Sequence, residues 1–158
     1  MNVIPNFLRN ASEIIRELDN HQDKFYPRIG EDRHASIIPN LYSKFKTLKD
    51  KDMSKNLIDL IFADNDFDPD LKDLYNFIQI QKYDIGDYII PHRDAYSITK
   101  LHLVTLTTST IDGLVCETVD HDLIKIYDNA GQYIDFPYES YHWVDPVANT
   151  RYSMVIAE

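Results

Sequence analysis

The sequence predicts a mainly β protein with N-terminal helices, an α+β arrangement, because its residue pattern changes near position 76. Residues 1–75 place apolar side chains at helical spacing, whereas residues 76–158 form short β-rich runs separated by turn residues. A chain of 158 residues is long enough for one domain with one sizeable core. We therefore expect a single domain, 1–158, in which the first half supports a β core formed by the second.

Helices are expected in three parts of the first half. Residues 11–18 and 56–62 both carry apolar residues three and four positions apart, and Ser54 is placed to cap the second helix. A third, short helix is expected after Pro69. Residues 26–40 contain two prolines and scattered charges, so we expect a loop or an outer strand there.

Short runs rich in β-branched and aromatic residues predict the strands of the second half. They occupy residues 76–83, 101–109, 113–118, 123–127, 132–136 and 151–157. Many short strands at even spacing are typical of a sandwich, a barrel or a jelly roll. Because the helices precede the strands, we expect the helices to cover one outer face of the sheet.

The charge of the chain argues against a nucleic-acid-binding surface. The formal net charge is −10, and acidic residues crowd into positions 64–70. Such a surface repels phosphate backbones. The acidic segment lacks the central glycine and terminal glutamate of an EF-hand loop, so we expect a solvated loop between helices rather than a calcium site.

The sequence shows neither a membrane-spanning segment nor a secretory signal, and these two observations bear on cellular location. No apolar run approaches the ~20 residues needed to span a bilayer, and residues 1–6 do not resemble a secretory signal. Cys116 is the single cysteine and lies in an apolar run, so we expect an inert core thiol. We expect a cytoplasmic protein that binds neither membranes nor nucleic acid, and the sequence does not indicate its oligomeric state.

Three residues form a candidate metal site. His92 and Asp94 are two positions apart in an extended segment and therefore point the same way, although such a pair alone is also typical of a solvated loop. His142 supplies a second imidazole from a distant segment. Two histidines and one carboxylate occupy one face of an octahedral Fe(II), leaving three positions for a co-substrate and dioxygen. A structural zinc site would want four ligands, often thiolates.

Arg151 is the candidate anion-binding residue. On the strand 151–157, Arg151, Ser153 and Val155 share one face, and the residues between them share the other. An arginine that faces inward needs an anion, and its planar guanidinium matches a carboxylate through two parallel hydrogen bonds. The alternative is a surface arginine on an edge strand.

Together these residues resemble the 2-oxoglutarate/iron(II) dioxygenase superfamily, most closely its prolyl-4-hydroxylase-like branch. That branch shows a tyrosine, a turn with glycine, His-x-Asp, a distal histidine and a basic residue. The corresponding residues here are Tyr83, Gly86, His92, Asp94, His142 and Arg151. The resemblance covers residues 76–158, and it departs from the family where a glycine pair is reduced to Gly113.

The resemblance implies a double-stranded β-helix, a jelly roll of the cupin type, with iron at its mouth. His92, Asp94 and His142 would be the catalytic metal ligands. The implied reaction is hydroxylation that uses Fe(II), 2-oxoglutarate and dioxygen, and the leading substrate is a prolyl or other amino-acid residue in a peptide or protein. An oxygenase of a small molecule or a nucleobase, or a non-catalytic jelly-roll binding module, is the alternative.

Four residues are implied to hold 2-oxoglutarate. Arg151, helped by Ser153, would pair with its distal carboxylate, and Tyr83 and Thr107 would also contact it. If Tyr83 faces inward, strand parity turns Phe77, Gln79 and Gln81 inward as well, and leaves Ile78 and Ile80 for the helices. Should Arg151 not be the anchor, Lys100 and Lys125 are the next basic residues to consider.

The remaining histidines are expected to have no ligand role. His102 has the opposite parity and is expected to pack in the core, and His21, His34 and His121 are expected to be exposed. Substrate contacts are expected from residues 26–40, with Arg28 and Arg33, and from Tyr96 after the metal motif, because exposed loops commonly carry such contacts.

The charge generates a first prediction. With a net charge of −10, the protein should show no salt-sensitive binding to duplex DNA at physiological ionic strength, as measured by fluorescence anisotropy. Micromolar binding that weakens steeply with added salt would contradict this prediction and favour a nucleobase substrate.

Overall fold

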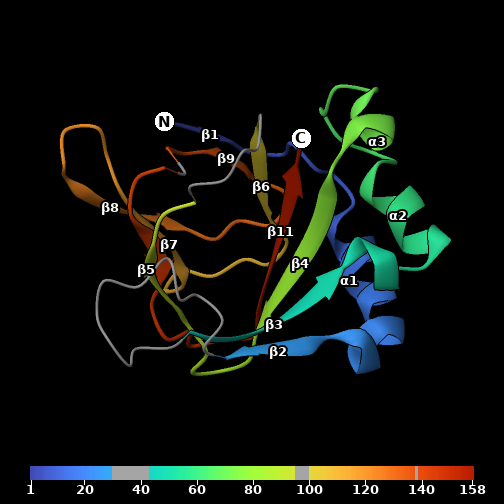
Figure 1. Ribbon diagram of the computed structural model, residues 1–158, viewed down its shortest axis with the longest axis horizontal. Coiled ribbons are helices and arrows are strands. Elements are labelled where there is room, and N and C mark those ends of the chain that lie inside the picture. Colours follow the sequence, from blue (N-terminus) through green and yellow to red (C-terminus); the bar gives the residue numbers. More distant parts are fainter. Residues whose placement is uncertain (30–42, 95–99, 138) are drawn as a thin grey trace.

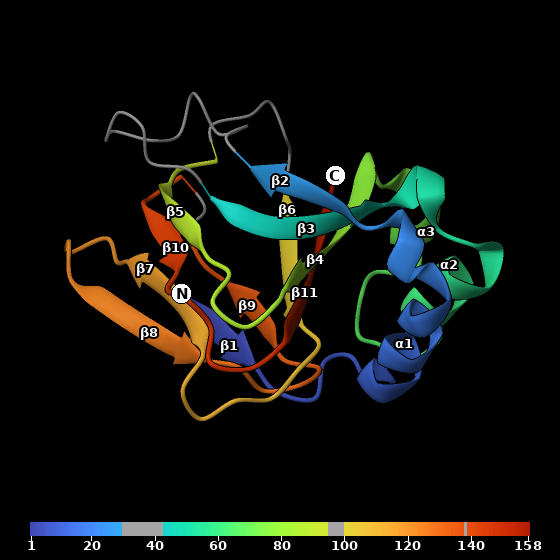
Figure 2. The same cartoon turned by 90° about the horizontal axis from the view of Figure 1, so that it is seen from below.

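Two antiparallel β-sheets pack face to face, and the helices cover the outer face of the larger sheet (Figure 1). The computed structural model describes residues 1–29, 43–94, 100–137 and 139–158. The large sheet has the strand order β1-β9-β6-β11-β4-β3-β2, and the small sheet has the order β5-β10-β7-β8. Figure 2 shows the small sheet and the helices on opposite sides of β4 and β11. The predicted β-rich architecture with helices on one outer face is confirmed.

The elements have the following bounds. The large sheet contains β1 (Asn2–Ile4), β9 (Tyr133–Asp135), β6 (Leu101–Thr105), β11 (Arg151–Ala157), β4 (Phe77–Tyr83), β3 (Lys44–Lys49) and β2 (Tyr26–Ile29). The small sheet contains β5 (Ile89–His92), β10 (His142–Val144), β7 (Gly113–Glu117) and β8 (Leu123–Tyr127). The α-helices are α1 (Ala11–Leu18), α2 (Lys55–Ile61) and α3 (Leu71–Leu74), and short 3-10 helices occupy Asp19–Lys24 and Asp50–Asp52. None of these helices is long and apolar enough to cross a bilayer.

Alternation along β4 and β11 separates two cores. Ile78, Ile80, Met154 and Ile156 point toward the helices and are fully buried. We call this the helix-side core; it also contains Ile14, Leu18, Leu57, Ile61 and Val104. The opposite faces of the same strands turn toward the small sheet, where Tyr83, Leu103, Leu114, Phe136 and Val144 form an inter-sheet core. The parity predicted for strands 76–83 and 151–157 is confirmed.

The first half of the chain also supplies strands to the large sheet. β2 is an edge strand at the start of residues 26–40, where an outer strand was one of the two expectations. β1, paired to β9, and β3, paired to β4, were not expected, which corrects the helical prediction for residues 1–75. Three lysines give β3 a polar sequence, although Phe45 and Leu48 are buried on its two faces. The sequence of β3 therefore carries little of the hydrophobic signal on which strand prediction depends.

His21 is buried, which corrects its predicted exposure. Its Nδ1 lies 3.1 Å from the carbonyl oxygen of Glu17, and its Nε2 accepts a hydrogen bond from the backbone N–H of Ser54 at 3.0 Å. The 3-10 helix that continues α1 brings this ring to the start of α2. The acidic residues 64–70 lie between α2 and α3 as predicted, and Asp64 and Asp66 both pair with Arg9.

The cap of α2 provides a stability test. The hydroxyl of Ser54 accepts a hydrogen bond from the backbone N–H of Leu57 at 3.1 Å, as its predicted capping role requires. Ser54→Ala should lower the free energy of unfolding by about 1 kcal/mol, measured by urea denaturation. The exposed Ser12 of α1 is the matched control, since Ser12→Ala removes no described cap and should be neutral or slightly stabilising. Equal effects of the two substitutions would contradict the capping role.

Candidate metal centre and adjoining cavity

A tight turn connects β4 of the large sheet to β5 of the small sheet, just before His92 and Asp94. Gly86 has a φ of +88°, a left-handed conformation that favours glycine. The carboxylate of Asp87 is buried and accepts a hydrogen bond from the backbone N–H of Asp84 at 2.9 Å, which closes the turn. Strand β5 follows directly and ends at His92.

Strand pairing brings the three predicted ligands together. In the register of β5 and β10, His92 lies opposite His142, and the two ring centroids are 4.2 Å apart. Asp94 follows His92 by two positions, and its Oδ2 lies 3.1 Å from Nε2 of His142. One ligand atom from each residue lies within 4.8 Å of the other two. His142 is buried, whereas His92 and Asp94 are partly open to the cavity described below.

Backbone carbonyl groups orient both imidazoles. Nδ1 of His92 lies 2.8 Å from the carbonyl oxygen of Ile90, and Nδ1 of His142 lies 2.9 Å from that of Ser140. A carbonyl oxygen only accepts, so both Nδ1 atoms carry a proton and donate it. Both rings therefore turn Nε2 toward Asp94, where its lone pair is the one that could bind a metal. Hydrogen bonds from the second ring nitrogen are typical of metal-binding histidines.

This donor set fits a divalent cation. Two Nε2 atoms and a carboxylate lie close together. Their lone pairs repel one another unless a cation or added protons lie between them. Imidazole and carboxylate are ligands that suit Fe(II), and a three-residue face leaves further coordination positions open. Among the described residues, this is the group of three or more His, Cys, Asp or Glu side chains close enough to hold an ion.

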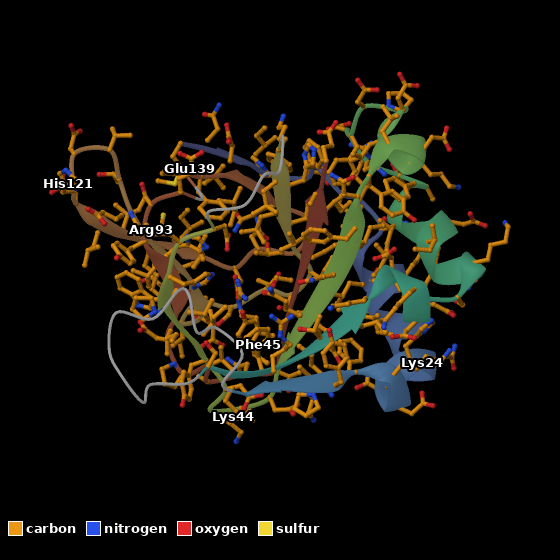
Figure 3. The ribbon with its side chains drawn as sticks, viewed as in Figure 1. Lys24, Lys44, Phe45, Arg93, His121 and Glu139 are labelled. Carbon is orange, nitrogen blue, oxygen red and sulfur yellow. The ribbon has the colours of Figure 1, made fainter. Side chains whose placement is uncertain are left out.

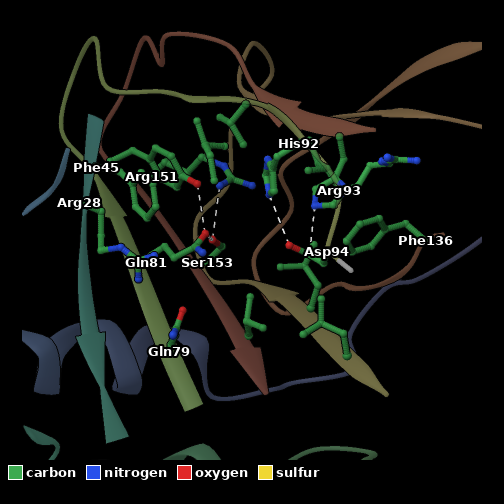
Figure 4. A pocket seen from close by; sticks show the side chains of 18 of the residues that line it. Arg28, Phe45, Gln79, Gln81, His92, Arg93, Asp94, Phe136, Arg151 and Ser153 are labelled. Atoms are coloured by element: carbon green, nitrogen blue, oxygen red, sulfur yellow. Dashed lines mark hydrogen bonds and ion pairs between the residues drawn. The ribbon is translucent and has the colours of Figure 1, made fainter. Parts of the chain in front are cut away.

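A cavity of about 410 Å³ adjoins the three ligands and lies between the sheets. Figure 4 shows His92 and Asp94 on one side of this cavity and Arg151, Ser153 and Gln81 on the other. Its wall includes the inward faces of β4, β6 and β11, as the parity of the sequence predicts. The lining side chains are Arg28, Phe45, Phe77, Gln79, Gln81, Tyr83, Ile89, His92, Arg93, Asp94, Leu101, Leu103, Leu114, Phe136, His142, Val144, Arg151, Ser153 and Val155.

Arg151 is buried in the cavity wall and already has an anionic partner. Its Nε lies 2.8 Å from Oδ2 of Asp128, and its Nη2 lies 3.2 Å from Oδ1, so the contact is bidentate. Only 3% of the Arg151 side chain and 1% of the Asp128 side chain are exposed. The guanidinium also packs over the ring of Tyr83, 5.1 Å from its centroid. The prediction that an inward arginine needs an anion is confirmed, but a residue of the chain supplies that anion.

Tyr83 and Ser153 flank Arg151, as their predicted roles require. Nη1 of Arg151 lies 3.4 Å from the hydroxyl of Ser153. The hydroxyl groups of Tyr83 and Ser153 both donate to Oε1 of Gln81, at 3.1 and 3.4 Å. Antiparallel pairing explains the grouping, because Arg151 lies opposite Tyr83 and Ser153 lies opposite Gln81. The two glutamines predicted to face inward, Gln79 and Gln81, both line the cavity.

Thr107 is not part of the cavity wall, and its contact with a co-substrate stays a prediction. Strand β6 ends at Thr105, so the alternation that was extended to position 107 stops before it. The hydroxyl of Thr107 instead accepts a hydrogen bond from the backbone N–H of Tyr152 at 3.1 Å. Lys100 and Lys125, the alternative anion-binding residues, do not line the cavity either.

Other predicted residues lie outside the site. His102 is buried as expected, with Nε2 2.8 Å from Glu158, and burial lowers its pKa below the ordinary value. Its other ring nitrogen contacts the hydroxyl of Tyr133, whose pKa burial raises to about 12. Cys116 is buried and its thiol pKa is raised, which agrees with an inert core thiol. Figure 3 shows the exposed His121 at the outer end of the β7–β8 hairpin.

Some functional candidates were missed by the sequence analysis. Asp128 lies between the predicted strands 123–127 and 132–136, and nothing local to it indicated a partner on β11. Phe136 packs edge-on against the ring of His142 at 4.8 Å, and no motif included Phe136. Of the residues named for substrate contact, Arg28 lines the cavity, and Arg33 and Tyr96 lie outside the described residues. His34, which was expected to be exposed, also lies outside them.

Comparison with known proteins identifies the fold. No protein-family model and no curated protein sequence matches the chain. Solved structures do match, including a 2OG-Fe(II) oxygenase family oxidoreductase from Burkholderia pseudomallei, with 16% identity and a TM-score of 0.68 over 98% of this chain and 83% of that one. A Trichoplax adhaerens prolyl hydroxylase, in complex with a hypoxia inducible factor oxygen degradation domain peptide fragment, matches with 15% identity and a TM-score of 0.67 over 99% and 81%.

A third similar structure is the non-heme alpha ketoglutarate dependent epimerase SnoN from nogalamycin biosynthesis, with 11% identity and a TM-score of 0.66 over 98% of this chain and 75% of that one. The chain therefore has the jelly-roll fold of these oxygenases, as the sequence predicted. Since the three proteins include an epimerase, this fold does not by itself fix a reaction or a substrate.

The metal centre generates a prediction. In calorimetric titrations with Mn(II) in place of Fe(II), the protein should bind one ion per chain. His92→Ala, Asp94→Ala and His142→Ala should each abolish that binding, because the two remaining ligands hold the ion too weakly. Asp94→Glu should also bind poorly, since the added methylene displaces the carboxylate. His121→Ala is the control and should bind normally, because His121 is exposed beside Glu117 and remote from the cavity. Normal binding by all three alanine variants would place the metal elsewhere.

Proposed function

We propose that this protein is an Fe(II)- and 2-oxoglutarate-dependent oxygenase. The observation that carries the proposal is the convergence of His92, Asp94 and His142 at a cavity whose opposite wall contains a buried arginine. A metal alone is compatible with many reactions, and a buried arginine alone is compatible with a structural role. Their combination in one cavity suits a co-substrate that chelates a metal at one end and carries a carboxylate at the other.

Bound Fe(II) supplies the activation of dioxygen, and the residues of the chain supply binding and orientation. His92 and His142 would each hold the ion through Nε2, and Asp94 would hold it through one carboxylate oxygen. The backbone carbonyls of Ile90 and Ser140 would keep both rings in the required orientation. The remaining coordination positions would face the cavity.

Arg151 would hold the distal carboxylate of 2-oxoglutarate. Asp128 accepts from two of the five guanidinium N–H donors, at Nε and Nη2, and Ser153 accepts from one at Nη1. One N–H on each of Nη1 and Nη2 would then serve a ligand. Ser153 lies beside Nη1, and its hydroxyl, which donates to Gln81 in this structure, would turn to donate to the same carboxylate. The ring of Tyr83 would support the guanidinium from its face.

The substrate would occupy the cavity beyond the co-substrate. Gln79 lies opposite Val155, two positions along the strands from the pair of Gln81 and Ser153. This places Gln79 and Val155 about 7 Å further from Arg151 than that pair. Phe77 and Leu101 continue this wall, which is apolar apart from the amide of Gln79. Such a surface suits an aliphatic side chain next to an amide, so we propose a prolyl or other amino-acid residue of a peptide or protein as the substrate. The alternative of a nucleobase is disfavoured by the net charge of −10.

The proposal is tested by turnover of the co-substrate in the absence of a substrate. Purified protein with Fe(II), 2-oxoglutarate and dioxygen should release succinate slowly. Arg151→Ala should raise the 2-oxoglutarate concentration required by about ten- to a hundred-fold. Arg151→Lys should recover only part of this loss, because lysine keeps the charge and loses the planar fork.

Arg9→Lys is the matched control, since Arg9 also pairs with carboxylates but lies outside the cavity, and it should leave turnover unchanged. A wild-type protein that releases no succinate and binds no metal would favour the non-catalytic binding module. Unchanged 2-oxoglutarate dependence in Arg151→Ala would move the carboxylate anchor to another residue, with Arg28 the next arginine on the cavity wall.

A further inference from the structure

The buried pair of Arg151 and Asp128 links the two sheets beside the cavity. Asp128 directly follows β8 of the small sheet, and Arg151 begins β11 of the large sheet. The carboxylate takes the side edge of the guanidinium through Nε and Nη2, at 2.8 and 3.2 Å. Because both side chains are almost completely removed from solvent, each charge depends on the other for compensation.

Asp128 is held in place independently of Arg151. Its backbone N–H donates to the carbonyl oxygen of Asp112 at 3.0 Å, and its own carbonyl oxygen accepts from the backbone N–H of Ser109 at 3.1 Å. Asp128 is therefore anchored by its backbone while its carboxylate faces the guanidinium. The position of the carboxylate does not require a ligand in the cavity.

We propose that Asp128 is a built-in counter-ion that keeps the empty site folded and limits how tightly the site binds a second carboxylate. This inference rests on the proposed function, since the second carboxylate is the distal one of 2-oxoglutarate. A ligand carboxylate at the Nη1 edge of Arg151 approaches a pair of zero net charge rather than an isolated cation. It also approaches the negative charge of Asp128 across the width of one guanidinium group.

The expected consequence is that Asp128 raises the stability of the ligand-free protein and lowers its affinity for 2-oxoglutarate. In the empty wild-type site, Asp128 compensates Arg151, so the fold does not depend on the co-substrate. Asp128→Asn keeps the size of the side chain and removes its charge, which leaves the arginine buried without a full counter-ion. The variant should therefore be less stable when empty, and 2-oxoglutarate should then supply the missing negative charge.

The experiment compares two keto acids by calorimetric titration into Mn(II)-loaded protein under anaerobic conditions. 2-Oxoglutarate carries the distal carboxylate, and 2-oxopentanoate has the same carbon chain without it. Asp128→Asn should bind 2-oxoglutarate about tenfold more tightly than the wild type, because a repulsion between like charges a few ångströms apart is removed. Its affinity for 2-oxopentanoate should change little, since that acid makes no contact with the Nη1 edge.

Asp112→Asn is the matched control. Asp112 is also buried close to Asp128, but its carboxylate accepts from the backbone N–H groups of Ala148 and Asn149 and has no contact with Arg151. It should lose stability without a change in the affinity for either acid. Asp128→Glu retains the charge and should not reproduce the tighter binding of 2-oxoglutarate.

Thermal unfolding provides a second readout if Asp128→Asn is poorly folded when empty. Saturating 2-oxoglutarate should raise its midpoint more than that of the wild type, and this result supports the proposal. Unchanged or weaker binding of 2-oxoglutarate by Asp128→Asn, or no gain in its midpoint, overturns it. If the wild-type protein binds neither acid, the proposed function itself is overturned. If the wild type binds 2-oxoglutarate and Asp128→Asn binds it no more tightly, only the role of Asp128 is overturned.

Discussion

The alternation of side chains along the paired strands β4 and β11 is the constraint on which the rest of the structure depends. Each strand turns one row of residues toward the helices and the other toward the small sheet. The row with Ile80 and Met154 closes the helix-side core, whereas the row with Gln81 and Ser153 lines the cavity. A shift of one residue in the pairing would bury the polar row among the helices and turn the apolar row into the cavity.

The same alternation explains how so small a chain combines a stable core with a polar interior. Helices α1 and α2 pack against the apolar row, so the space between the sheets does not have to be filled with apolar side chains. Several polar groups in that space are paired with one another, as in the contact of Arg151 with Asp128 and the hydrogen bonds to Gln81. Buried charge is tolerated there because its partners are supplied by the chain.

The sequence predicted features that depend on local spacing. The metal ligands were recognisable because His92 and Asp94 are two positions apart on an extended segment and because His142 and Arg151 follow in a familiar order. The inward rows of β4 and β11 followed from strand parity alone. The fold class followed from helices preceding many short strands, and the jelly roll itself was indicated by the resemblance to a family.

Features that depend on contacts between distant segments were not predictable. Asp128 carries no motif, and its pairing with Arg151 arises only when β8 and β11 are brought together by the two sheets. The strand predicted over residues 101–109 is shorter in the structure, where β6 ends at Thr105, so strand parity does not extend to Thr107. His21 was misassigned because its partner, the backbone of Ser54, lies at the start of another helix. Strand β3 was missed because its lysines obscure its two buried apolar residues.

The central claim is that one cavity holds a metal at His92, Asp94 and His142 and a carboxylate at Arg151. Its most direct test is a crystal structure of the protein prepared anaerobically with Mn(II) and 2-oxoglutarate, with diffraction data collected at the manganese absorption edge. We expect one anomalous peak between the two Nε2 atoms and the carboxylate of Asp94, with the distal carboxylate of 2-oxoglutarate at Nη1 of Arg151. A peak elsewhere, or 2-oxoglutarate bound with its distal carboxylate away from Arg151, would contradict the claim.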